Sequence, residues 1–202
     1  MSPMTKKILV VLSEWGYWGE ELIGPLDVLT KAGYTLDFMT PFGRKPPALP
    51  PSMEEGYLDP PLNKVVTDSH FAARTTEVHE STLLNNPINL SEKISLMPYF
   101  NGINFGLDLA AFHDKREEFW KDFVDPYDAL LLPGGSGPMA DMVNNERLHN
   151  LILGYVDRDK LIAAECYCVT CLAFAREWSD RKSIIWGKKV TGHAREYDHK
   201  EN

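Results

Sequence analysis

The chain places all three of its cysteines in one short segment, LIAAECYCVTCLAFAR. An apolar strand pattern over residues 161–164 passes through Cys166 directly into an apolar helical pattern. A residue at such a strand-to-helix turn forms a nucleophile elbow, which needs small residues two positions away on each side, here Ala164 and Cys168. The dipole of the following helix would lower the pKa of the thiol. We therefore predict that Cys166 is a nucleophile.

Other interpretations of the cysteines stay open at this point. Free cysteine is most often a small buried apolar residue, and spacing alone leaves this reading open for Cys166 as well. Cys168 and Cys171 fit it directly, because they lie three apart on the apolar face of the following helix. We expect no metal and no other cofactor, since three ligands on this turn would diverge and no fourth cysteine completes a closed site.

Two consecutive glycines follow a buried strand over residues 129–132 in the segment YDALLLPGGSGP. The backbone amides of Gly134 and Gly135, with the amide of Tyr167 at the start of the later helix, would form an oxyanion hole. A Pro-Gly-Gly sequence after a strand is also commonly only a turn. These amides can therefore form an oxyanion hole only if the turn at Cys166 lies beside the two glycines.

Two regions of the sequence offer ionisable side chains that could move protons. Glu20 and Glu21 open a helix predicted over residues 21–32, where a carboxylate suits the helix dipole. A glutamate at the end of the first strand can also share a proton with a thiol. His193 follows a short predicted strand over residues 189–191 and could act as a base.

The surrounding pattern predicts an α/β protein with a doubly wound parallel sheet. A continuous apolar run over residues 7–12, a helix over 21–32 and an alternating run over 34–40 form a βαβ unit. Such a sheet binds ligands at the carboxyl ends of its strands. The rhythm resumes with a strand over 129–132, a helix over 144–157, a strand over 161–164, a helix over 168–178 and a strand over 189–191.

The intervening segment differs in composition. Six prolines between residues 46 and 61, together with little periodicity, predict a loop or insertion over residues 45–112 within a single domain spanning residues 1–202. A short amphipathic helix over residues 114–123 should lead back to the core. An insertion of this size usually covers a site or an interface.

Charge and hydropathy exclude several partners. The net charge of -8 and the scattered basic residues argue against nucleic acid. No apolar run approaches the roughly 20 residues of a membrane-spanning helix. The apolar run near the start is too short for a signal peptide, and Glu14 and Trp15 follow it. We expect a cytoplasmic protein that acts on a small molecule.

Together these segments resemble the ThiJ/PfpI superfamily, whose glutamine amidotransferase-like fold also serves glyoxalase III chaperones and isocyanide hydratases. The resemblance implies a flavodoxin-like sandwich with Cys166 as nucleophile, selects Glu21 over Glu20 as the glutamate beside the thiol, and places His193 near the elbow. The long insertion is similar to that of the larger, chaperone-type branch. The matching pieces are ILVVLSE at 8–14, EELIGPLDVLTKAGYTLDFMTP at 20–41, YDALLLPGG at 127–135, LIAAECYCVTCLAFA at 161–175 and GKKVTGH at 187–193.

The chain departs from the family pattern in two places. Tyr167 stands where relatives with glyoxalase III activity generally have histidine, and Cys168 replaces the usual glycine. The sequence also ends at Asn202, about where relatives continue into a last strand and helix. C-terminal elements are therefore expected to be missing. We expect the surface near residues 185–202 to bind a second copy of the chain or a separate C-terminal fragment.

The expected activity is that of a cysteine-dependent hydrolase or lyase acting on a small electrophilic carbon, such as an aldehyde, amide or isocyanide. The alternative is a non-enzymatic chaperone or a redox sensor that works through oxidation of Cys166. Tyr167 favours this alternative. A glutamine amidotransferase domain is disfavoured because the sequence has no His-x-Glu pair near its end.

Overall fold

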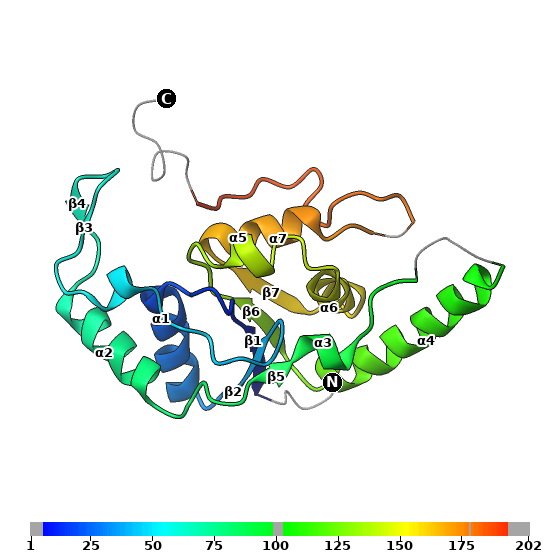
Figure 1. The fold of residues 1–202 in the computed structure, drawn as a ribbon, viewed down its shortest axis with the longest axis horizontal. Coiled ribbons are helices and arrows are strands. Elements are labelled where there is room, and N and C mark those ends of the chain that lie inside the picture. Colours follow the sequence, from blue (N-terminus) through cyan, green and yellow to red (C-terminus); the bar gives the residue numbers. More distant parts are fainter. Residues whose placement is uncertain (1–5, 99–102, 178, 194–202) are drawn as a thin grey trace.

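The central element of the computed structural model is a five-stranded sheet in the order β5-β2-β1-β6-β7, with every strand pairing parallel (Figure 1). The structure describes residues 6–98, 103–177 and 179–193. Helices cover both faces of the sheet, which confirms the predicted doubly wound, flavodoxin-like arrangement. The strands are β1 (Lys7–Val11), β2 (Thr35–Thr40), β5 (Ile88–Asn89), β6 (Ala129–Leu132) and β7 (Leu161–Ala164).

Alternate side chains of β1 enter two separate cores. Leu9 and Val11 pack with the helices α4 (Phe105–Phe123), α6 (Glu146–Asp157) and α7 (Val169–Phe174). Ile8 and Val10 pack on the opposite face with α1 (Gly19–Lys31) and α2 (Ser69–Glu80). Because β1 is buried on both faces, its sequence from Ile8 onward is an uninterrupted run of apolar residues.

The segment after β2 contains more regular structure than its sequence suggested. Its turn η1 (Pro50–Met53) precedes an antiparallel hairpin of β3 (Leu58–Asp59) and β4 (Lys64–Val65). Helix α2 then begins at its cap Asp68, whose side chain accepts a hydrogen bond from the amide of Phe71 at 2.9 Å. Strand β5 and helix α3 (Leu90–Lys93) follow, so this segment supplies the edge strand of the central sheet.

Two predicted helices and one predicted strand differ from the structure by more than two residues. Helix α4 begins at Phe105 rather than at residue 114. The helix expected over 168–178 is a short turn, η2 (Cys166–Cys168), followed by α7, which ends at Phe174. The strand predicted over residues 189–191 is wrong, because that stretch has no regular secondary structure. No helix in the described ranges is long and apolar enough to cross a membrane.

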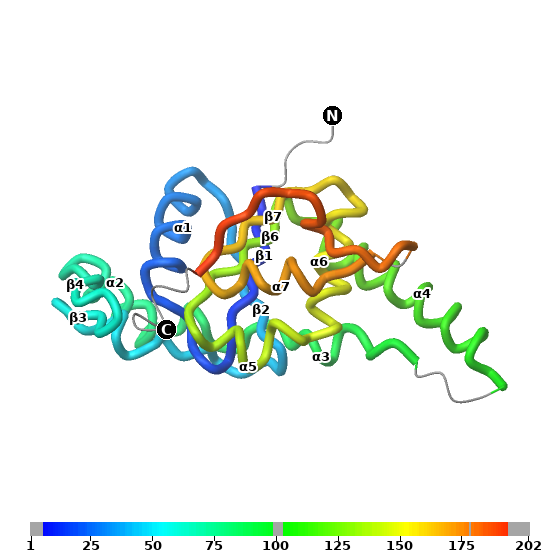
Figure 2. The backbone as a smooth tube through the Cα atoms, turned by 90° about the horizontal axis from the view of Figure 1, so that it is seen from above, coloured from blue at the N-terminus to red at the C-terminus, as the bar shows by residue number. Residues whose placement is uncertain are grey.

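Residues 183–193 form an irregular segment, here called the strap. Figure 2 shows the strap running from the α6 side of the molecule back towards α1. The hydroxyl of Ser183 donates a hydrogen bond to the carbonyl of Leu172 in α7 at 3.0 Å. Trp186 and Val190 are 71% and 54% exposed, and together they leave apolar surface uncovered. Association through residues 185–202 stays a prediction, and residues 194–202 lie outside the described part of the chain.

Candidate active site

Cys166 occupies the tip of a sharp turn between β7 and α7. Its φ of 50° lies in the left-handed region that side chains rarely adopt, at a cost of about 1 kcal/mol or more. The turn is fixed by two backbone hydrogen bonds of Glu165: its amide donates to Leu132 at 3.1 Å, and its carbonyl accepts from Cys168 at 2.9 Å. This is the strained elbow geometry that the sequence pattern predicts.

Glu21 reaches this elbow from the first turn of α1. Its Oε2 atom accepts a hydrogen bond from the amide of Gly134 at 2.7 Å, and its carboxyl group also forms a hydrogen bond with the thiol of Cys166. Burial raises the pKa of Glu21 to about 7, although these two hydrogen bonds oppose the rise. The charges of Glu165 and Glu20 add to it. Near neutral pH, Glu21 is therefore able both to accept and to release a proton.

The thiol of Cys166 is more difficult to ionise than the helix dipole suggested. Burial, and then the charge of Glu21, raises its pKa to about 11, while amides of Gly135 and Tyr167 that donate to the sulfur oppose the rise. The predicted lowering of the thiol pKa is therefore wrong. Helix α7 has only six residues, so its dipole is too small to overcome burial beside a carboxylate.

His193 approaches the thiol from the strap. Its Nδ1 atom lies 3.4 Å from Sγ of Cys166. Its ring stacks on Tyr167, with ring centroids 4.3 Å apart and planes inclined by 22°. Gly192 permits this close approach, because a Cβ atom there would lie 3.2 Å from Cβ of Val169. The strap thus brings His193 to the elbow without the strand that was predicted to carry it.

The two consecutive glycines have different roles. The amides of Gly135 and Tyr167 donate hydrogen bonds to the sulfur, whereas the amide of Gly134 donates to Glu21. Gly134 therefore does not match its predicted part in the oxyanion hole. A Cβ atom at Gly134 would lie 2.6 Å from the carbonyl oxygen of Glu165, so this position needs glycine for the elbow to pack. Gly135 has a φ of 95°, which also favours glycine.

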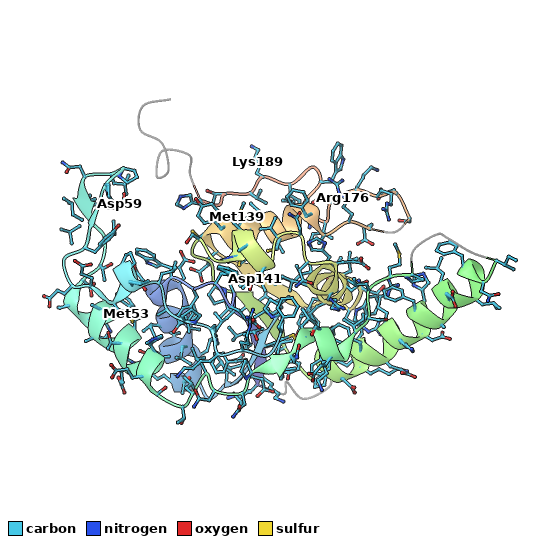
Figure 3. The ribbon with its side chains drawn as sticks, in the orientation of Figure 1. Met53, Asp59, Met139, Asp141, Arg176 and Lys189 are labelled. Atoms are coloured by element: carbon cyan, nitrogen blue, oxygen red, sulfur yellow. The ribbon has the colours of Figure 1, made fainter. Side chains whose placement is uncertain are left out.

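These groups open into one cavity of about 400 Å³. The segment between β2 and β5 forms part of its wall. Asp59 lies on the hairpin, on the same side of the molecule as the strap (Figure 3). The lining residues of this segment could not be predicted from the sequence, because they come from turns without periodicity. The lining residues are Trp18, Glu20, Glu21, Leu49, Pro51, Asp59, Val66, Gly135, Ser136, Cys166, Tyr167 and His193.

The other two cysteines lie below the site in the core. Cys168 and Cys171 are both fully buried, and the Cys168 thiol donates to the carbonyl of Pro133 at 3.1 Å. Their burial agrees with the interpretation of both as small apolar residues. Within the described ranges, no group of three histidine, cysteine or acidic side chains is arranged to hold a metal ion.

A sequence model described as ThiJ/PfpI family-like matches residues 12–192. The chain belongs to the ThiJ/PfpI family. This match covers the elbow, Glu21 and the strap as far as Gly192. No curated protein matches the chain significantly.

Solved structures share the fold of this ThiJ/PfpI protein at low sequence identity. Rapid Encystment Protein 24 kDa of Francisella tularensis is 20% identical, with a TM-score of 0.58 over 95% of this chain and 72% of that one. Glyoxalase III of Candida albicans is 16% identical, with a TM-score of 0.52 over 95% and 69%. A further crystal structure is 24% identical, with a TM-score of 0.65 over 96% of this chain and 71% of that one. These likenesses establish the fold alone.

Proposed function

We propose that this ThiJ/PfpI protein is a cysteine-dependent hydrolase or lyase that acts on a small electrophilic carbon, such as that of an aldehyde, amide or isocyanide. One observation carries the proposal. Glu21, His193 and two backbone amides converge on the thiol of Cys166 inside a single cavity. The ThiJ/PfpI family includes enzymes such as glyoxalase III, which supports an enzymatic role.

The first step is attack by the sulfur of Cys166 on the electrophilic carbon. The thiol proton passes to the carboxylate of Glu21, whose pKa of about 7 leaves the ionised form available near neutral pH. The new sulfur–carbon bond pushes an electron pair onto the substrate oxygen or nitrogen. The amides of Gly135 and Tyr167, which face the sulfur, stabilise that negative charge.

The second step returns a proton to the adduct. His193, with Nδ1 close to the sulfur, and protonated Glu21 are the two groups placed to donate it. A hydrolase would then need water to release the product from sulfur. A lyase would instead move a proton within the adduct before the sulfur–carbon bond breaks.

The second candidate function is redox sensing through Cys166. Tyr167, at the position after the nucleophile, favours this candidate because it cannot supply the adjacent imidazole. All three cysteines are free thiols, which fits either function in a reducing compartment such as the cytoplasm.

The test is turnover of methylglyoxal, simple amides and isocyanides by the intact protein and by Cys166→Ser. Cys171→Ala serves as the matched control, because this cysteine lies outside the cavity. Turnover that is lost in Cys166→Ser and retained in Cys171→Ala supports the enzyme. An inert panel, with Cys166 oxidised reversibly by dilute peroxide, would establish the sensor instead.

A further inference from the structure

Negative charge gathers around the reactive thiol. Glu20, Glu21 and Asp59 all line the cavity, and Glu165 directly precedes the nucleophile. They come from the start of α1, the hairpin and the end of β7, so three separate elements bring carboxylates to one place. In the described part of the chain, no lysine or arginine lines the cavity.

These carboxylates have little to neutralise them. Among the described residues, neither Glu20 nor Asp59 forms an ion pair. One oxygen of Asp59 accepts a hydrogen bond from the amide of Leu62 at 2.9 Å, which fixes the side chain without cancelling its charge. Burial and then the charge of Glu20 raise the pKa of Glu165, as expected in a field of uncompensated carboxylates.

The rest of the wall is apolar and aromatic. Trp18, Leu49 and Val66 line the cavity together with the acidic groups. Apolar walls exclude water and so strengthen the field of the carboxylates inside the cavity. An indole ring is also the aromatic surface that binds a cation best.

We propose that the cavity selects a small electrophile that carries a positive charge, with its cationic group near Glu20 and Asp59 and its reactive carbon at Cys166. This selectivity rests on the proposed function, since it names the substrate class of the same site. Carboxylate-bearing analogues are rejected, because they would bring a further negative charge beside Glu21. The hairpin that carries Asp59 is then a specificity element.

The experiment compares two thiol reagents of opposite charge and similar size. Trimethylammonioethyl methanethiosulfonate and sulfonatoethyl methanethiosulfonate each form a disulfide with Cys166 and release methanesulfinate. The rate of each reagent with the protein is divided by its rate with 2-mercaptoethanol, which corrects for the intrinsic reactivity of the reagent. Mass mapping confirms Cys166 as the labelled residue. In the wild type, the corrected cation-to-anion ratio should be about tenfold or more.

Two variants assign the ratio to the proposed groups. Glu20→Gln and Asp59→Asn should each lower the corrected ratio by about threefold, because each removes one charge from the cavity. Glu118→Gln, an exposed glutamate of α4 away from the cavity, should leave it unchanged. A wild-type ratio near one, or an equal fall in Glu118→Gln, would overturn the proposal.

Labelling of Cys166 does not require turnover, so the charge selectivity of the cavity and the enzymatic function are tested independently of each other. A high cation-to-anion ratio in a protein that turns over nothing retains the charge selectivity and removes the enzyme. Turnover of neutral carbonyl compounds by a protein whose ratio is near one retains the enzyme and removes the selectivity.

Discussion

Replacing Glu21 by glutamine should make Cys166 more reactive towards iodoacetamide at pH 8, although Glu21 is the proposed catalytic partner. The charge of Glu21 is the second cause, after burial, that raises the pKa of Cys166 to about 11. Glutamine keeps an oxygen for the amide of Gly134 and removes the charge. Its amide group can also donate to a thiolate, so the ionised sulfur becomes easier to form.

The size of the effect follows from the cited pKa. The ordinary value for the thiol is 9.0, and Cys166 is raised to about 11. If Glu21 accounts for roughly half of this rise, its removal increases the thiolate fraction at pH 8 about tenfold. A thiolate of lower pKa is less nucleophilic, which offsets about threefold of that gain. Alkylation should therefore become about three times faster.

The assay is the rate of Cys166 carbamidomethylation, followed by intact mass from pH 5 to pH 9. Wild type and Glu21→Gln should converge at the acidic end, because Glu21, with a pKa of about 7, is itself protonated there. Glu20→Gln is the matched control, a neighbouring glutamate that does not touch the thiol. A slower Glu21→Gln variant at pH 8, or equal acceleration by Glu20→Gln, would refute the reasoning.

Three further predictions follow from the same geometry. Cys166 should alkylate first under limiting iodoacetamide, since the other two cysteines are fully buried, and preferential labelling of either would remove the elbow assignment. The free energy of unfolding of Glu21→Gln, expressed as its difference from the wild-type value, should increase by about 3 kcal/mol when the pH is raised from 4 to 8. The sign follows because the folded state holds the Glu21 proton up to a pKa of about 7 and the unfolded state only to about 4.5, so the wild type loses stability across that window. Urea titrations at both pH values measure this, and a constant difference would contradict it. Gly134→Ala should destabilise the fold by about 2 kcal/mol or more, whereas Gly24→Ala, with open space around the new methyl group, should stabilise it slightly, and equal melting temperatures would contradict the clash.

The sequence carried enough information for the sheet and the elbow because both depend on local patterns. A strand buried on two faces must be apolar throughout, as β1 is, and the βαβ unit fixes a parallel neighbour. The elbow needs small residues beside the turn, which Ala164 and Cys168 supply. Only the family resemblance selected Glu21 rather than Glu20 as the partner of the thiol. Adjacent residues of a helix point in different directions, and the sequence alone does not say which of the two side chains faces the site.

The cavity wall could not be predicted in the same way. Leu49, Asp59 and Val66 come from turns and from a hairpin of two-residue strands, and such segments carry no periodic pattern in the sequence. The direction of the Cys166 pKa also escaped the sequence, because it depends on burial and on the distance to Glu21. Both properties arise only when distant segments meet.

Tyr167 explains how His193 reaches the thiol although the predicted strand before it does not form. Their stacked rings contribute about 0.5–1.5 kcal/mol, or about a twofold to tenfold preference for the position beside Cys166. In Tyr167→Ala, diethylpyrocarbonate should therefore modify His193 up to about tenfold faster than in the wild type. Tyr167→Phe keeps the ring, so its rate of His193 modification should equal the wild-type rate. The exposed His70 provides an internal reference in the same digest. Equal His193 rates in the alanine and phenylalanine variants would mean that the strap holds His193 without the stack, and Tyr167 would then keep only its backbone amide as a role in the site.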